Sequence, residues 1–298
     1  MRAFTIKRRA CDFDAQAWPA LHPVLARIYA SRGLRAGDSL EPRLTQLADP
    51  AALGGIDRAC DLLIDAIDNE RNICIVGDFD ADGATGTAVA IRALRMLGAK
   101  RVSYCVPNRF RHGYGLSPGL VDELAADALD LLVTVDNGIA CHAGVDAARA
   151  RGMRVVVTDH HLPGASLPEA DAIVNPNVEG DAFPSKSIAG VGVVFCLMLA
   201  LRARLRASGA FDAARPEPDL STLLDLVALG TVADLVALDV NNRVLVAAGL
   251  RRIRAGKACA GVLALCRVSG RDLSRVVASD LGFALAPRIN AAGRLEDM

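Results

Sequence analysis

The chain has 298 residues and a mass of 31.3 kDa, which is enough for one large or two ordinary domains with a buried core. Hydrophobic residues make up 52% of it and the mean hydropathy is +0.29, values that exclude a long disordered chain. Lys plus Arg and Asp plus Glu both number 34, so the net charge of zero excludes a global basic field for binding nucleic acid.

In chain order, the sequence predicts three segments. Residues 1–70 form an N-terminal helical segment that prolines interrupt. In residues 71–210, short apolar runs alternate with stretches of helical period, which predicts an α/β core with a parallel sheet flanked by helices. Strands are predicted at 73–77, 102–106, 131–135, 154–158 and 172–174, and helices at 56–69, 84–97, 117–128, 142–151, 187–207, 220–238 and 242–255. Residues 211–298 are predicted to be a mostly helical continuation.

Cysteine usage and the length of the apolar runs indicate the compartment. The eight cysteines include no C-x-x-C pair, and several lie in apolar runs, as Cys74 and Cys196 do. This usage is typical of a reduced, cytoplasmic protein. The N-terminal stretch lacks the apolar core of a signal peptide, and the longest apolar run, residues 188–201, is too short to span a bilayer. We therefore expect a buried helix there and no membrane partner.

Three clusters of acidic residues follow three of the predicted strands. They are Asp78-Phe-Asp80-Ala-Asp82, Asp136-Asn137-Gly138 and Asp159-His160-His161. The carboxyl ends of parallel strands meet at one edge of a sheet, so these side chains are expected to gather there. Carboxylates brought together repel one another and lose hydration, a conflict that a divalent cation resolves. Carboxylate oxygens with imidazole nitrogens suit Mn²⁺ or Mg²⁺, and zinc stays open as a third choice.

Each cluster taken alone has a plainer interpretation. A single Asp at a strand end is usually a helix N-cap. The spacing of Asp78, Asp80 and Asp82 also opens a calcium loop, but the twelfth position is Val89, where that loop needs Glu. A fourth carboxylate, Asp234, interrupts an apolar helical pattern and taken alone is a tolerated, partly exposed residue. The coincidence of three clusters at equivalent strand ends favours a metal site.

Seven short motifs follow one another along the chain. They are GDFDADGAT (77–85), TVDNG (134–138), TDHH (158–161), VNPN (174–177), AGVGVVF (189–195), ALGTVADLV (228–236) and PRINAAGR (287–294). This ordered set resembles the DHH phosphoesterase superfamily from about residue 70 to the end of the chain. The loop PNRF-x-x-GYGL (107–116) makes it most similar to the RecJ type of single-strand-specific exonuclease rather than to smaller phosphatases.

The resemblance implies a centre with two Mn²⁺ or Mg²⁺ ions. The implied metal ligands are Asp78, Asp80, Asp82, Asp136, His160 and Asp234, with Asp136 bridging the ions. The implied catalytic residues are Asp136, His161, which would face the scissile phosphate, and Asp159, which would orient a histidine. Neighbouring side chains in an extended segment point opposite ways, so one histidine on metal and one on substrate is physically sensible.

The resemblance also implies a reaction and a substrate. The reaction is two-metal hydrolysis of single-stranded DNA from its 5′ end, releasing nucleotides during DNA repair and recombination. Arg109 would bind a phosphate, and Tyr114 or Phe110 would stack on a base. Arg288 and Asn290 would contact the DNA backbone or brace the metal site. The plainer interpretation of residues 107–115 is a basic surface loop with a buried tyrosine.

RecJ-type proteins continue into a DHHA1 domain and an OB fold, and we expect both to be absent from a chain that ends at residue 298. Such a chain would bind Mn²⁺ yet degrade single-stranded DNA poorly. The expected partners are single-stranded DNA and, by resemblance, a single-strand-binding protein and a helicase. Two alternatives stay open. One is a DHH enzyme acting on small nucleotides, oligoribonucleotides or pyrophosphate, and the other is a non-catalytic binding module.

Overall fold

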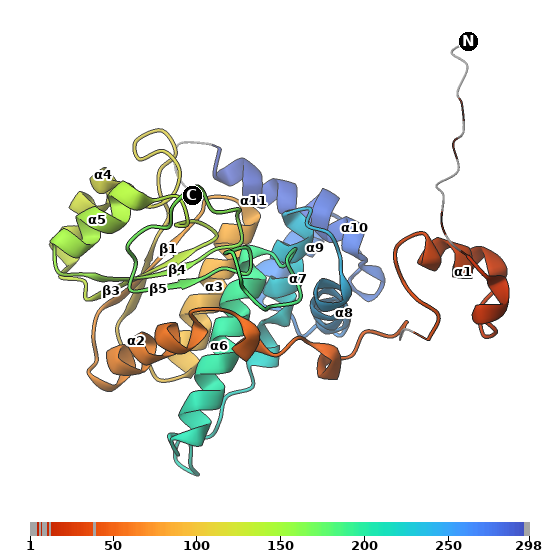
Figure 1. The fold of residues 1–298 in the computed structure, drawn as a ribbon, viewed down its shortest axis with the longest axis horizontal. Coiled ribbons are helices and arrows are strands. Elements are labelled where there is room, and N and C mark those ends of the chain that lie inside the picture. Colours follow the sequence, from red (N-terminus) through yellow and green to blue (C-terminus); the bar gives the residue numbers. More distant parts are fainter. Residues whose placement is uncertain (1–4, 6, 8–10, 12, 38–39, 295–298) are drawn as a thin grey trace. The chain divides into compact units, whose positions relative to one another are not determined.

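Short apolar runs of the sequence form the strands of a parallel sheet in the computed structural model, which describes residues 5, 7, 11, 13–37 and 40–294 (Figure 1). The strands are β1 (Ile73–Gly77), β2 (Val102–Cys105), β3 (Leu131–Val135), β4 (Arg154–Thr158) and β5 (Ala172–Val174). Their order across the sheet is β2-β1-β3-β4-β5, and every neighbouring pair is parallel. The predicted α/β core is confirmed. Strands β1 and β3 are buried along their whole length, as expected for a sheet covered on both faces.

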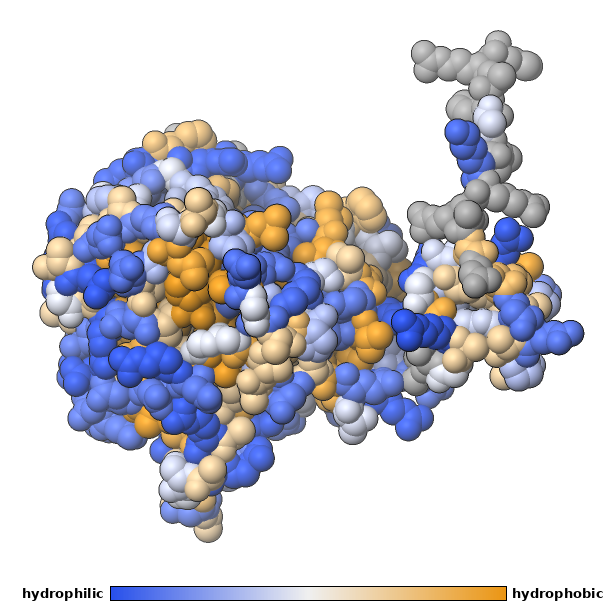
Figure 2. Space-filling view, viewed as in Figure 1, coloured by the Kyte–Doolittle hydropathy of each residue, from blue (hydrophilic) through white to orange (hydrophobic). Residues whose placement is uncertain are grey.

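Helices cover both faces of this sheet (Figure 1). One face packs against α2 (Ile56–Asp68), α3 (Ala81–Met96) and α6 (Gly190–Ala207), and the other against α4 (Pro118–Leu124) and α5 (His142–Ala150). A short helical turn, η4 (Ala125–Asp127), extends α4. Hydrophilic side chains cover most of the visible outer surface, whereas apolar side chains show through near the strands (Figure 2). The sheet divides the apolar core into two layers, one packed against each of its faces.

The strand ends are level with one another at the carboxyl edge. The residues in register there are Gly77, Val135, Thr158 and Val174. The residues that follow them are Asp78, Asp136, Asp159 and Asn175. Backbone bonds continue past the strands, because the amide of each of these three aspartates donates to the carbonyl of the neighbouring strand's last residue at 3.1–3.2 Å. These polar residues therefore begin side by side along the carboxyl edge of the sheet. We call the three aspartates among them, Asp78, Asp136 and Asp159, the acidic row.

The chain after β5 is mostly helical, as predicted. Besides α6 it contains η5 (Leu220–Leu223), α7 (Leu224–Ala233), α8 (Val240–Arg254), α9 (Ala260–Val268), η6 (Leu273–Arg275), α10 (Ala278–Asp280), the π-helical turn η7 (Leu281–Leu285) and α11 (Ala286–Ala292). Helix α7 packs against α3, α6 and α8, and α11 returns to α3. The last helices therefore end beside the acidic segment that follows β1.

The chain divides into two compact units, residues 1–42 and 43–298. The smaller unit contains η1 (Ala15–Ala17) and α1 (Pro23–Ala30), and its core is built on Trp18, whose ring stacks on Tyr29. The larger unit begins with η2 (Leu44–Gln46) and η3 (Pro50–Ala52). This boundary differs from the one predicted at residue 70, because α2 buries an apolar stripe against α6 and β5. Within the described part of the chain, no helix is long and apolar enough to cross a membrane.

Candidate metal centre

The segment after β1 supplies three carboxylates, those of Asp78, Asp80 and Asp82. Asp80 caps α3, where its Oδ1 accepts a hydrogen bond from the amide of Gly83 at 2.9 Å. Asp82 lies in the first turn of α3 and is fully buried. Its two carboxylate oxygens accept the amides of Gly190 (2.7 Å) and Val191 (2.9 Å), the first residues of α6. The AGVGVVF motif therefore places a helix N-terminus against Asp82, where backbone donors are otherwise unpaired.

Asp136 stands at the centre of the row and has an unusual backbone. Its φ is 63°, in the left-handed region that residues other than glycine rarely adopt. Gly190 makes room for its carboxylate, since a Cβ on Gly190 would lie 2.7 Å from Asp136 Oδ1. The hydroxyl of Tyr114 donates to the Asp136 carbonyl at 2.9 Å. A strained conformation fixed from two sides is typical of functional positions.

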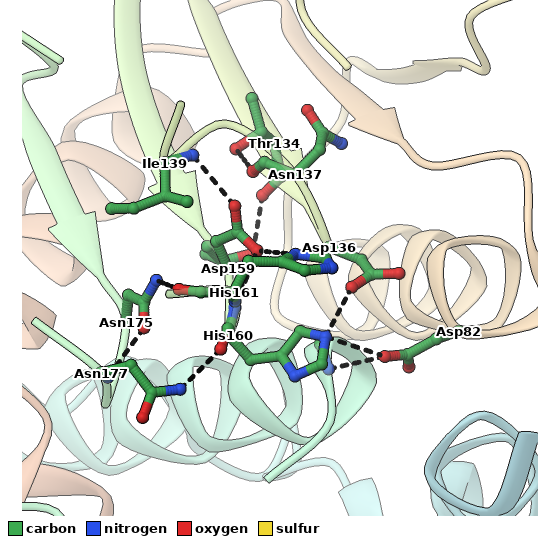
Figure 3. Close-up of polar contacts among 12 residues, drawn as sticks. Asp82, Thr134, Asp136, Asn137, Ile139, Asp159, His160, His161, Asn175 and Asn177 are labelled. Carbon is green, nitrogen blue, oxygen red and sulfur yellow. Dashed lines mark hydrogen bonds and ion pairs between the residues drawn. The ribbon is translucent and has the colours of Figure 1, made fainter. Parts of the chain in front are cut away.

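His160 points into the acidic cluster (Figure 3). Its Nε2 lies 3.0 Å from Asp136 Oδ1, 3.5 Å from Asp234 Oδ2 and 3.9 Å from Asp82 Oδ2. Among the described residues, neither His160 Nε2 nor Asp136 Oδ1 has a hydrogen-bond partner, although both atoms are buried. Buried polar atoms without partners are rare, and these two lie 3.0 Å apart with the carboxylates of Asp82 and Asp234 beside them. This is the arrangement expected of metal ligands.

His161 has a different partner. Its Nδ1 is 2.7 Å from Asp159 Oδ1, and its side chain is about half exposed, at 48%. That hydrogen bond raises the pKa of His161, so the charged imidazole is favoured. Burial by itself would raise the pKa of Asp159, but the hydrogen bonds from His161 and from the amide of Ile139 lower it. Asp159 therefore orients His161 as an ionised acceptor, and the two histidines point to different partners.

Burial raises the pKa of four carboxyl groups of the cluster. Burial, reinforced by neighbouring carboxylates, raises the pKa of Asp82 and of Asp136 well above the ordinary value. Burial also raises the pKa of Asp234, and it raises that of Asp78 to about 7. A divalent cation reverses this shift, because it attracts the ionised form.

Three sets of ligand atoms are close enough to share an ion. The sets are Asp136 with His160 and His161, Asp82 with His160 and Asp234, and Asp78 with Asp80 and Asp136. Within each set the ligand atoms lie within 4.8 Å of one another. Asp136 belongs to the first and third sets, and its Oδ1 lies 3.0 Å from His160 Nε2, which belongs to the second set. Oxygen and imidazole donors suit Mn²⁺ and Mg²⁺, so the residues present fit the two ions that the resemblance implies.

Residues 107–116 bring the predicted substrate-binding side chains to the same edge. The guanidinium of Arg109 lies over the Phe79 ring, 4.7 Å from its centroid, and both belong to exposed or half-exposed positions. The Tyr114 ring meets the His161 ring edge-on at 6.2 Å. Burial raises the pKa of Tyr114, which keeps its hydroxyl a donor. Phe110 is 71% exposed and is therefore accessible to a base.

The two residues predicted in PRINAAGR have different surroundings. Asn290 Oδ1 accepts a hydrogen bond from the amide of Ala81 at 2.7 Å, so it braces the start of α3 between Asp80 and Asp82. This contact is the kind expected if Asn290 braces the metal site, which is one of its two predicted roles. Arg288 is exposed, and its guanidinium donates to the carbonyl of Ala284 one turn earlier in the helix.

Sequence reasoning assigned no role to the asparagines that follow the strands. Asn137 is buried and donates to the carbonyls of Val76 (3.0 Å) and Val135 (2.9 Å), which ties the ends of β1 and β3 together. Asn175 and Asn177 reach the backbone of the two histidines. These asparagines lie in the VNPN and TVDNG motifs. A side chain that bonds to a distant backbone carbonyl leaves no periodic pattern in the sequence, so the motifs alone did not indicate this role.

Comparisons with known proteins agree with this geometry. The DHH family, N-terminal domain, matches residues 72–231. The single-stranded-DNA-specific exonuclease RecJ of Dickeya dadantii is 56% identical over all of this chain and 52% of its own length. The protein of the same name from Escherichia coli is 54% identical over 98% of this chain and 51% of its own length. The chain thus spans about half the length of the curated relatives it matches.

A solved structure is similar over nearly the whole chain. It is the crystal structure of RecJ in complex with Mn²⁺ from Thermus thermophilus, which is 36% identical and has a TM-score of 0.76. The match covers 94% of this chain and 38% of that one. The fold around the acidic row is therefore shared with a manganese-bound protein.

Proposed function

The chain belongs to the DHH family, and on that premise we propose that it hydrolyses single-stranded DNA from the 5′ end with two Mn²⁺ or Mg²⁺ ions. The names of the Dickeya dadantii and Escherichia coli relatives, at 56% and 54% identity, support this substrate. The manganese complex of the Thermus thermophilus relative supports the metal. The chain spans about half the length of those relatives, so its activity, its substrate and the direction of hydrolysis are proposed here.

The position of Asp136 carries the proposal. It is buried at the middle of the row, and it shares a ligand set with Asp78 and Asp80. Its Oδ1 has no hydrogen-bond partner among the described residues and lies 3.0 Å from His160 Nε2, which belongs to another set. In the proposed centre, Asp78, Asp80 and Asp136 would hold one ion. The ligands assigned to the second ion are Asp82, His160 and Asp234.

Side chains of the protein then have separate roles in the hydrolysis of the phosphodiester. Two bound ions supply a nucleophile at neutral pH and neutralise charge on the reacting phosphoryl group. His161 faces the solvent side, and its bond to Asp159 favours the charged imidazole, which donates a hydrogen bond to a phosphoryl oxygen. Arg109 binds a phosphate with its planar fork of donors. Tyr114 holds the Asp136 carbonyl and presents its exposed ring edge beside His161.

A panel of end-labelled substrates tests the proposal. The 298-residue chain is incubated with Mn²⁺ and a 5′-labelled single strand, the same strand in a duplex, and an oligoribonucleotide of the same sequence. We expect labelled mononucleotide to appear first from the single-stranded DNA, and none from the matched variant Asp136→Asn, which tolerates the left-handed backbone.

Other outcomes would contradict the proposal in distinguishable ways. Preferred cleavage of the oligoribonucleotide would point to the small-substrate members of the family. Loss of label only after the rest of the strand is degraded would reverse the direction. Tight Mn²⁺ binding without hydrolysis of any substrate would indicate a binding module.

The biological setting belongs to the same proposal. Action in DNA repair and recombination, a cytoplasmic location, and association with a single-strand-binding protein and a helicase follow from the family resemblance alone. Co-sedimentation of the chain with a single-strand-binding protein, with and without DNA, tests the first partner. Binding that requires DNA would show that the two proteins only share a substrate.

A further inference from the structure

A short turn after β5 holds the backbone of both histidines. Asn177 Nδ2 donates to the His160 carbonyl at 2.6 Å, and Asn175 Nδ2 donates to the His161 carbonyl at 2.9 Å (Figure 3). Within the turn, the amide of Asn177 donates to Asn175 Oδ1 at 2.8 Å. The segment 175–177 is thus folded on itself, and it presents one amide to each histidine.

These contacts fix the directions of the two imidazoles. A carbonyl bonded to a rigid donor fixes the plane of its peptide, and with it the side chains on either side. His160 points at Asp136 while His161 points at Asp159, and the two ring centroids are only 4.6 Å apart. Without an anchor on both carbonyls, a small rotation of one peptide plane would move each ring away from its partner.

The turn is itself anchored by a lysine from the loop before α6. Lys186 Nζ donates to the Pro176 carbonyl at 2.6 Å and to the Asp181 carbonyl at 2.8 Å. The carboxylate of Asp181 is nearly fully buried, lies 3.4 Å from the same ammonium, and accepts the amides of Gly54 and Phe183 at 2.7 and 2.8 Å. A compact ammonium suits this site, because it offers several donors to oxygens in different directions.

We propose that the turn 175–177, anchored by Lys186, is a positioning element that sets the metal affinity of His160 and the orientation of His161. Asn177 and Lys186 are positioning residues in this assignment, since neither reaches the acidic row. Partners that orient metal ligands from behind change metal affinity or activity when they are removed. The metal part of the inference stands on the geometry, and only its kinetic part rests on the proposed function.

The variants Asn177→Ala and Lys186→Met test the inference on the metal-free 298-residue chain. Matched controls are Asn69→Ala, whose side-chain amide donates to the Asp65 carbonyl at 2.9 Å, and Lys100→Met, whose ammonium pairs with Glu70 at the surface. Calorimetric titration with Mn²⁺ should show affinity weakened by about 10- to 100-fold in Asn177→Ala. Lys186→Met should lose affinity by a smaller factor, and both controls should stay within about twofold of the wild type.

Three further tests separate positioning from general destabilisation. Imidazole ¹⁵N resonances of His160 and His161 in the metal-free protein should shift in Asn177→Ala and not in Asn69→Ala. In the double variant Asn177→Ala/Lys186→Met, the Mn²⁺ affinity should equal that of Asn177→Ala alone, because Lys186 acts through the turn. With single-stranded DNA as substrate, kcat should fall while KM stays unchanged.

The outcomes distinguish this inference from the proposed function. Altered Mn²⁺ affinity and shifted resonances in a protein that does not cleave DNA would uphold the positioning role and reject the nuclease. Unchanged affinity and unchanged imidazole resonances in both variants would overturn the inference even if the wild type is an active exonuclease. Fully additive losses in the double variant would overturn the role of Lys186.

Discussion

Burial makes the carboxylates of the centre a source of instability in the metal-free chain. Asp82 and Asp136 are almost inaccessible to solvent, and their pKa values are raised by burial and by neighbouring acids. The amides of Gly190 and Val191 offset part of this cost at Asp82. At Asp136 Oδ1 the described residues offer no such donor. Metal binding and stability are therefore coupled at the level of single side chains.

Asp78 gives this coupling a pH dependence. Its pKa is raised from 3.8 to about 7, first by burial and then by Asp80. A carboxyl whose folded-state pKa is raised contributes stability that is fully present below its unfolded pKa and is lost as pH rises through the folded pKa. The metal-free wild type should therefore lose stability relative to Asp78→Asn between about pH 4 and about pH 8, by at most about 1.4 kcal/mol per pH unit. Urea unfolding of both proteins with a chelator measures this, and a pH-independent difference would contradict it.

The two histidines should fail in different ways when they are truncated. His160→Ala removes a nitrogen that lies among three carboxylates, so Mn²⁺ affinity should fall by about tenfold or more. His161→Ala removes the group beside Asp159, so Mn²⁺ should still bind while turnover is lost. Mn²⁺ calorimetry and single-strand hydrolysis measure the two effects. Equal loss of affinity in both variants would reject this division.

At the scale of elements, the strands and the acidic row follow from simple rules. Apolar runs predict the strands, and parallel strands bring their carboxyl ends to one edge, so the meeting of Asp78, Asp136 and Asp159 could be predicted from sequence. The supporting contacts could not. The amides of Asn175 and Asn177 bond to carbonyls in another loop, and such partners depend on where loops pass one another in space.

The glycine at the start of α6 is an element-scale constraint on the centre. An added Cβ at Gly190 would lie 2.7 Å from Asp136 Oδ1, whereas at Gly119, in the first turn of α4, it would meet open space. Gly190→Ala keeps the amide that donates to Asp82 and tests only the close approach to Asp136. We expect it to cost about 1–3 kcal/mol of stability and to weaken Mn²⁺ binding.

The matched control makes that prediction specific. Gly119→Ala should be neutral or stabilise by up to about 1 kcal/mol, because alanine favours a helix over glycine. Chemical unfolding with a chelator and Mn²⁺ calorimetry of both variants are the measurements. Normal Mn²⁺ affinity in Gly190→Ala would show that Asp136 has room to move and that the contact is not a constraint.

At the scale of the whole molecule, the centre is assembled from distant parts of the larger unit. Asn290 bonds to the amide of Ala81, 209 positions away, and a Cβ on Gly293 would lie 2.1 Å from the Phe79 carbonyl. The last helix is therefore part of the support for the acidic segment. This explains why the chain shows no division near residue 210, where the sequence suggests the helical continuation begins.

The smaller unit has a core of its own, on Trp18, Ala26 and Leu34, and the residues of the centre all belong to the larger unit. We therefore expect residues 43–298 to bind Mn²⁺ with an affinity within about twofold of the whole chain. Calorimetry on the two proteins is the measurement, with thermal unfolding as a control for folding. A large loss of affinity in a folded 43–298 protein would show that the smaller unit contributes to the centre.

Crystals of the 298-residue chain soaked in Mn²⁺ and measured at the manganese absorption edge test the two-ion centre most directly. We expect two anomalous peaks on either side of the Asp136 carboxylate, one beside Asp78 and Asp80 and the other beside His160. In crystals of Asp136→Asn, at least one of the two peaks should disappear. A single peak in the wild type, or peaks that do not contact Asp136, would contradict a two-ion centre built on Asp136.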